Sequence, residues 1–77
     1  MSVFEEFQQR NQRIIHEILV KENKSLSLFE LKKKSQLANL YFFKALDQLE
    51  QKDVLERKRK YNNIWISLKD VDDNASI

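Results

Sequence analysis

Two clusters of basic side chains are the residues of this chain whose type and spacing point most directly to chemistry. They are Lys32-Lys33-Lys34 and Arg57-Lys58-Arg59-Lys60, and they flank an amphipathic stretch. Because Lys and Arg neutralise phosphate groups, clusters on both sides of one helix predict a polyanion-binding face. The alternative is that both clusters are solvated surface, as runs of charge commonly are. The three lysines also suit the C-terminal end of a helix, where the dipole favours cations.

The rest of the charge is distributed unevenly along the chain. The 77 residues include 14 Lys and Arg against 12 Asp and Glu, a net charge of +2. Residues 69–77 contain one Lys and three Asp, so the remainder has 13 basic and 9 acidic residues and a net charge of +4. We expect one domain over residues 1–68, followed by an acidic, disordered tail at 69–77.

The residue inventory argues against catalysis and metal binding. The chain has no cysteine, no glycine and a single histidine, His16. It therefore lacks a thiolate nucleophile, a Gly-rich phosphate loop and the ligands of a zinc cluster, and we expect no enzyme, no cofactor and no metal. The apolar runs are far shorter than the roughly 20 residues that cross a bilayer, and the N-terminus is charged. We expect a cytoplasmic, soluble protein without a membrane segment, nucleoid-associated if prokaryotic.

The stretch Ser35–Gln51, SQLANLYFFKALDQLEQ, predicts a tight turn and then an amphipathic helix over about residues 39–52. One face of that helix is apolar and consists of Leu37, Phe42, Ala45, Leu46 and Leu49. The residues left to face outward are Leu40, Tyr41, Phe43, Lys44, Asp47 and Gln48. If the domain holds this helix towards a partner, the outward residues are its functional surface.

Two further helices and a hairpin are expected around this helix. Ser2 with Glu5 fits a capping box before a first helix over residues 3–22. Ser27 with Glu30 fits another before a second helix over residues 28–35, whose inward candidates are Leu28, Leu31 and Phe29. Residues 54–60 and 64–68 have strand character, and the polar connection between them suits a hairpin.

The turns must be made without glycine or proline, because the chain contains neither. Asn and Asp tolerate a positive φ better than other non-glycine residues. The candidates for such positions are Asn23, Asp53, Asn62 and Asn63.

The first turns of the first helix carry three apolar side chains, Val3, Phe4 and Phe7. A helix of this length is expected to overhang so small a body, and burying these side chains against a second copy would make residues 1–10 a dimer interface. An equally weighted alternative is that Phe4 and Phe7 fold back on the chain's own core.

A family pattern runs from Leu46 to Arg57, LDQLEQKDVLER. It resembles the segment of winged helix-turn-helix regulators, of MarR-like and ArsR-like type, in which a Leu-Glu pair and a turn residue precede two apolar residues and a charged strand. The resemblance covers about residues 12–68 and implies a mainly α fold of three helices with a C-terminal β-hairpin, the wing. Three positions depart from the family pattern: Gln36 and Asp53 replace its glycines, and Ala38 replaces its Ser or Thr cap, for which Asn39 is the alternative.

The basic clusters and the resemblance together imply a sequence-specific double-stranded DNA-binding protein, a small transcriptional regulator. The helix over 39–52 would enter the major groove, and the wing over 57–63 would lie on the backbone or in the minor groove. Base or near-base contacts are expected from Asn39, Tyr41, Phe43, Lys44 and Gln48. Phosphate contacts are expected from Lys32, Lys33, Lys34, Arg57, Lys58, Arg59 and Lys60, and the wing tip consists of Tyr61, Asn62 and Asn63.

Leu40 and Phe43 support a competing interpretation. Exposed together they would form an apolar patch, which often marks a contact with a protein partner, so the alternative function is a protein-protein interaction module. A third possibility is that one of them packs under the second helix beside Phe29. Trp65 is expected to be a core or edge aromatic that covers the hairpin, with base stacking as the less favoured alternative.

Overall fold

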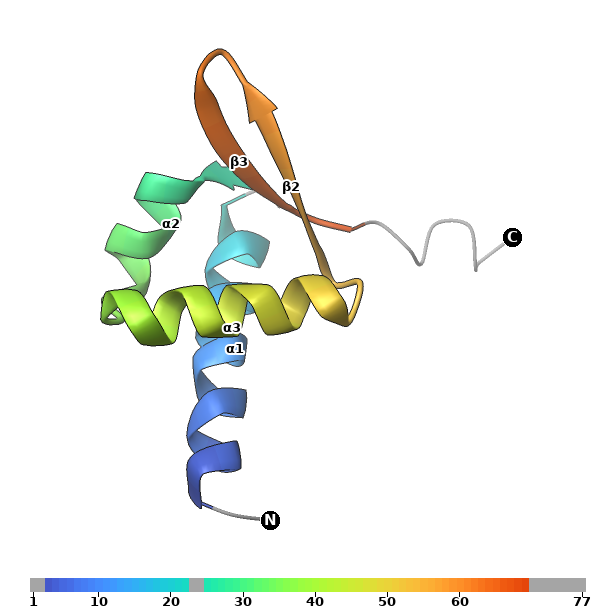
Figure 1. Cartoon of the computed structure of the whole chain (residues 1–77). Helices are drawn as coiled ribbons and strands as arrows, with labels where there is room; N and C mark the ends of the chain where they lie inside the picture. Colours follow the sequence, from blue (N-terminus) through green and yellow to red (C-terminus); the bar gives the residue numbers. More distant parts are fainter. Residues whose placement is uncertain (1–2, 23–24, 70–77) are drawn as a thin grey trace.

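The computed structural model describes residues 3–22 and 25–69, which form three helices and a small antiparallel sheet (Figure 1). The elements are α1 (Val3–Lys21), β1 (Ser25–Ser27), α2 (Leu28–Ser35), α3 (Asn39–Gln51), β2 (Leu55–Lys60) and β3 (Asn63–Leu68). The three helices expected from the sequence are confirmed to within one residue at each end. The expected C-terminal hairpin is present as β2 and β3, and β1 adds a third strand that was not predicted and makes the fold mixed α/β. Ser2, Asn23 and residues 70–77 lie outside the described residues.

The third strand was missed because it is only three residues long. β1 pairs antiparallel with β3, in the sheet order β1-β3-β2, and places Leu26 opposite Ile66. Ile66 is buried, so this pairing brings Leu26 onto the core-facing side of the sheet. The flanking Ser25 and Ser67 side chains meet on the other side, where their Oγ atoms are 3.2 Å apart.

The core lies where the three helices meet the inner face of the sheet. α3 contributes four of its buried residues, and the spacing of these residues is that of a single helical face, as the sequence predicts. The other elements close over that face. The buried apolar residues are Ile15, Leu19, Leu31, Phe42, Ala45, Leu46, Leu49, Leu55 and Ile66.

The turn between α2 and α3 is built without glycine. Gln36 ends α2 in the left-handed region at φ 59°, a conformation that the sequence did not predict for glutamine. Buried Ser35 supports it: the Ser35 hydroxyl donates to the carbonyl of Lys32 at 2.8 Å and accepts from the N–H of Leu37 at 3.2 Å. These bonds satisfy backbone groups that the helix end leaves unpaired. α2 begins as expected, since the N–H of Glu30 donates to Oγ of Ser27 at 3.2 Å.

α3 begins without a side-chain cap. Ala38 is its N-cap and makes no capping hydrogen bond, and Asn39 is already the first helical residue. The alternative in which Asn39 caps the helix is therefore wrong. The polar end of Asn39 is instead available on the exposed surface.

The hairpin closes through a tight turn. Tyr61 and Asn62 both have positive φ, 53° and 62°, which is the requirement of a type I′ turn. Asp53, after α3, has φ 64°, so Asp53 and Asn62 both take the positive φ that the sequence predicts. Asn63 was also a candidate, but it belongs to β3 and does not have a positive φ. Tyr61 was predicted to lie in this connection, but not to take a positive φ. Lys69 was assigned to the tail, yet its N–H donates to the carbonyl of Val54 at 2.9 Å and its Nζ lies 3.0 Å from Asp53.

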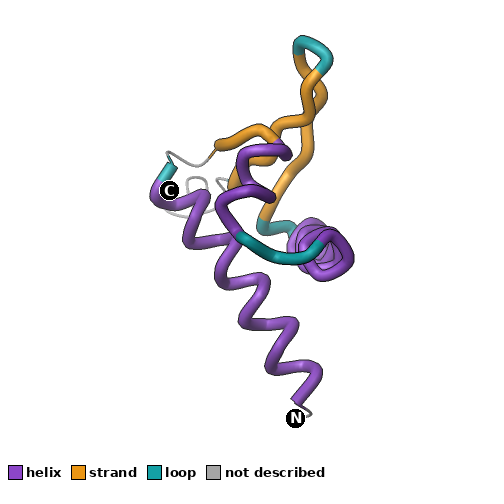
Figure 2. Tube along the Cα trace, turned by 90° about the vertical axis from the view of Figure 1, so that its left-hand side faces the viewer, coloured by secondary structure: helices purple, strands orange, loops and turns teal. Residues whose placement is uncertain are grey.

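The arrangement leaves two elements projecting from the core. The hairpin extends from one side of α3, and the first turns of α1 extend past α3 in the opposite direction (Figures 1 and 2). In Figure 2, α3 is seen nearly along its axis and lies to one side of both. Within the described ranges, no helix combines the length and apolarity that a membrane span requires.

Candidate functional site

α3 is the centre of the candidate site, and its flanks are occupied differently. The core covers one face through Phe42, Ala45, Leu46 and Leu49. α1 covers part of one flank, and the hairpin covers part of the other. The side chains predicted to face outward are therefore divided among three directions, and only some of them reach open solvent.

The α1 side of α3 holds Gln48 in a polar seam. Nε2 of Gln12 donates to Oε1 of Gln48 at 2.6 Å, and Nε2 of Gln48 is 3.2 Å from Oε1 of Gln8. Nζ of Lys52 extends the seam by donating to Oε1 of Gln12 at 2.8 Å. The prediction that the Gln48 side chain faces outward is wrong, because both ends of its amide bind glutamines of α1. A surface amide and an interhelical amide look alike in a helical pattern, so these contacts could not be predicted.

Tyr41 also turns towards α1. Its ring makes an edge-to-face contact with Phe7, with centroids 5.1 Å apart, and 39% of the residue stays exposed. Nζ of Lys44 lies 5.6 Å from the centre of the Phe4 ring, a cation–π contact. Phe7 therefore folds back on its own chain, as one of the two alternatives expected. Val3 and Phe4 remain more than half exposed.

The hairpin side of α3 holds Arg57 in a fork of carboxylates. Arg57 donates from Nη2 to Glu50 at 2.7 Å and from Nε to the other carboxylate oxygen of Glu50 at 2.9 Å. Nη2 also lies 3.2 Å from Asp47. The hydrogen bond to Glu50 and the charges of both carboxylates raise the pKa of Arg57 above its usual value, against a smaller lowering by burial. Arg57 was predicted to hold a phosphate, but its guanidinium is committed to α3.

The strand geometry then places Arg59 differently from Arg57. Leu55, Arg57 and Arg59 share one side of β2, since strand side chains alternate. Leu55 is in the core and Arg57 lies over Glu50, while Arg59 is further out and lines a hollow with Phe43. Lys58 and Lys60 point to the other side of the hairpin. Three predicted cations are paired or partly covered: Lys58 lies 3.4 Å from Glu56, Lys34 lies 3.7 Å from Glu22, and Lys32 is half-buried.

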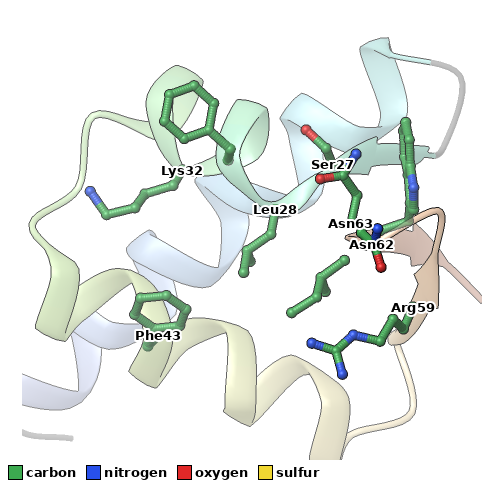
Figure 3. Close-up of a pocket in the computed structure, with 10 residues that line it drawn as sticks. Ser27, Leu28, Lys32, Phe43, Arg59, Asn62 and Asn63 are labelled. Atoms are coloured by element: carbon green, nitrogen blue, oxygen red, sulfur yellow. The ribbon is translucent and has the colours of Figure 1, made fainter.

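The hollow lies between α2, the N-terminal half of α3 and the hairpin. Figure 3 shows Leu28 pointing down from α2, Phe43 rising from α3, and the guanidinium of Arg59 entering from the hairpin. Its volume is about 660 Å³. Two cations and no carboxylate line it, which makes it electropositive. The lining residues are Ser27, Leu28, Phe29, Lys32, Phe43, Arg59, Asn62, Asn63, Ile64 and Trp65.

A smaller hollow of about 350 Å³ lies on the other side of the hairpin. Lys58 and Lys60 line it together with Tyr61 and Trp65, again without a carboxylate. Nζ of Lys60 sits 5.7 Å from the centre of the Tyr61 ring. Cations from β2 therefore border both sides of the hairpin, and Trp65 contributes to both hollows.

Several residues of the larger hollow were not predicted to belong to the site. Phe29 was an inward candidate and is instead 73% exposed, so neither Leu40 nor Phe43 packs under it in a closed core. The sequence did contain the signal: Leu28 and Leu31 define the buried stripe of α2, and Phe29 falls one residue off that stripe. Ile64 lines the hollow beyond the end of β1, which pairs with β3 only at Trp65, Ile66 and Ser67.

No protein-family model matches the chain, and no curated protein matches it significantly. Within residues 3–22 and 25–69, the acidic and histidine side chains form no group of three that could hold a metal ion. We therefore infer the function from the geometry of the chain itself.

Replacing Gln48 tests the polar seam. Gln48→Ala leaves the amide of buried Gln12 without its acceptor and should lower the free energy of unfolding by about 1–2 kcal/mol. Gln51→Ala is the matched control, because Gln51 is exposed on the same helix, and it should change stability by less than about 0.5 kcal/mol. Urea denaturation followed by far-UV circular dichroism measures both. Equal effects would show that Gln48 is not a structural residue.

Replacing the two arginines of β2 tests the carboxylate fork. Arg57→Ala should destabilise the fold by about 1 kcal/mol, the upper end for a surface pair, because it breaks a bidentate contact. Titration of the guanidinium should not change this loss at neutral or mildly alkaline pH, since the raised pKa keeps Arg57 protonated there. Arg59→Ala, on the same side of the same strand, should cost less than about 0.5 kcal/mol. A larger loss for Arg59 than for Arg57 would reverse the assignment.

Proposed function

We propose that this chain is a winged helix-turn-helix protein that binds double-stranded DNA and acts as a small transcriptional regulator. The observation that carries the proposal is the placement of Lys32 and Arg59. They come from α2 and the hairpin, 27 positions apart in sequence, and they line one hollow beside α3 that has no carboxylate in its lining. Such a surface attracts a phosphate backbone at any sequence.

The element order supports the same proposal. A helix pair, α2 and α3, joined by a three-residue turn is followed directly by a two-stranded hairpin, which is the layout that the sequence resemblance implies. A helix fits the major groove of B-DNA, and a hairpin beside it can reach the neighbouring backbone or minor groove.

The N-terminal half of α3 is the proposed reading segment. Asn39 and Lys44 are exposed there, and Phe43 is 38% exposed and able to meet a thymine methyl. Gln48 is not among the proposed base-contacting residues, because its amide binds α1. Tyr41 lies at the edge of the proposed reading segment, since its ring contacts Phe7. Asp47 and Glu50 follow on the next turns, and their charge makes the C-terminal half of α3 the less favourable end for phosphates.

The basic side chains on the two sides of the hairpin indicate how it would contact DNA. Arg59 lies on one side, and Lys58 and Lys60 lie on the other. A wing inserted in the minor groove has a phosphate backbone on each side, so cations on both sides of the hairpin fit that position. The turn residues Tyr61 and Asn62 would then be the deepest part of the wing.

The homodimer belongs to the same proposal. Val3 and Phe4 are 82% and 54% exposed on a helix end that projects away from the hairpin. Joining two copies there would double the number of phosphate contacts and leave the α2 and hairpin sides of α3 open. Phe7 contributes less than expected, because Tyr41 already covers part of it.

A salt titration with a double-stranded oligonucleotide tests the proposal. Binding should weaken steeply as salt rises, because each neutralised phosphate releases condensed counterions. Arg59→Ala should reduce the slope of log K against log salt by about 0.9, the value for one lost phosphate contact. Arg13→Ala is the matched control: it removes the same charge from the exposed surface of α1 and should leave the slope unchanged.

A flat titration at low salt would contradict DNA binding. Equal changes in slope for Arg59→Ala and Arg13→Ala would show that binding responds only to net charge.

One observation favours a second candidate function, a protein-interaction module. Leu40 is 70% exposed and lines a shallow hollow with Phe43, which in turn borders the larger hollow with Phe29. We call these three side chains the apolar strip, because Phe43 lines one hollow with Leu40 and the other with Phe29. If the strip docks on a protein, Leu40→Ser should abolish capture of a specific partner at unchanged stability, and the DNA titration should be flat.

A further inference from the structure

The larger hollow has a composition that the proposed contacts with paired DNA do not require. Its lining includes exposed aromatic rings from two elements, Phe29 of α2 and Phe43 of α3, and Trp65 of β3 lies at its border with the smaller hollow. A double helix presents phosphates and groove edges, whereas aromatic rings are useful to a ligand that offers the flat face of a base.

We propose that this hollow receives an unpaired base of a nucleic acid, so that the chain prefers DNA with a single-stranded segment over fully paired DNA. This inference rests on the proposed function and names the form of nucleic acid that the site takes. The rings would stack on the base, while Lys32 and Arg59 would bind the phosphates on either side of it.

The charges favour this occupant over a peptide. An apolar peptide would need the rings alone, and an interface built for it gains nothing from cations that must be desolvated. Lys32 and Arg59 lie at the α2 and hairpin sides of the hollow (Figure 3), and no carboxylate in its lining neutralises them. Cations that border stacked aromatics are the arrangement by which proteins hold single strands without reading their sequence.

The polar rim suits the edge of a base. Asn62 and Asn63 line the hollow from the wing tip, and their amides can both donate and accept hydrogen bonds.

The size of the hollow is compatible with this ligand. Its volume of about 660 Å³ lies within the range of roughly 300–1,000 Å³ for sites that take small organic molecules. Phe29 is 73% exposed and Phe43 is 38% exposed, so a base can reach both rings without opening the core.

Trp65 supplies the readout, because it is the only tryptophan in the chain. The intact protein is titrated with three oligonucleotides of equal length: a single strand, its fully paired duplex, and the duplex with one bulged nucleotide. Fluorescence of Trp65 and fluorescence anisotropy of labelled DNA are recorded at one salt concentration. The single strand and the bulged duplex should quench Trp65, and they should bind about tenfold more tightly than the paired duplex.

Phe29→Ser is the diagnostic variant, since Phe29 is exposed and has no part in the proposed contacts with paired DNA. It should lose most of the preference for unpaired DNA, about tenfold in affinity, and keep its affinity for the duplex. Val20→Ser is the control, because Val20 is an exposed apolar residue of α1 outside the hollow, 54% exposed. Val20→Ser should retain both the preference for unpaired DNA and the affinity for the duplex.

Each other outcome overturns the inference. Salt-dependent binding to all three oligonucleotides with equal affinity removes the unpaired-base site and leaves duplex binding in place. No binding to any of them removes both proposals. Quenching of Trp65 by an acidic, phenylalanine-containing peptide but not by the single strand assigns the hollow to a protein partner.

Discussion

Burial of one face of α3 is the constraint on which the rest of this structure depends. Phe42, Ala45, Leu46 and Leu49 close the core from that face, so the helix cannot rotate without exposing them. The two flanks of α3 are then fixed as well. α1 supplies glutamines to one flank, and the hairpin supplies Arg57 to the other.

Those flanking contacts decide what remains for a ligand. The amide of Gln48 and the guanidinium of Arg57 have the chemistry of DNA contacts, yet both are used within the chain. They hold α1 and the hairpin at set positions relative to α3, which in turn places Lys32, Phe43 and Arg59 around one hollow. Gln48 and Arg57 were predicted to contact DNA, but in the fold they hold in position the elements that carry the remaining candidate residues.

Much of the fold could be predicted from the sequence, because helical periodicity and capping are local. The stripe of α3 and the Ser27–Glu30 cap follow from spacing alone. What failed was non-local: β1 is visible only through its pairing with Ile66, and the partners of Gln48 are 36 and 40 positions away. Gln36 and Tyr61 took positive φ because the fold needed tight turns and the chain offers no glycine there.

The candidate site was predicted in outline and corrected in detail. Clusters of Lys and Arg can be read from the sequence, but which of them lies near a carboxylate cannot. Arg57 and Arg59 are two residues apart on the same side of β2, and only the first meets Glu50. The aromatic lining of the hollow was hidden for the same reason, since Phe29 and Phe43 come to line one hollow only after the helices and the hairpin pack.

The central claim is that α2, the N-terminal half of α3 and the hairpin form one nucleic-acid-binding face. Mapping amide chemical-shift changes in the ¹⁵N-labelled protein on addition of DNA at low salt tests it most directly. The account predicts changes concentrated at Lys32, Asn39, Phe43, Lys44 and Arg59 and at the hairpin turn, with α1 beyond Gln12 unaffected. Changes confined to α1, or none at all at saturating DNA, would contradict it.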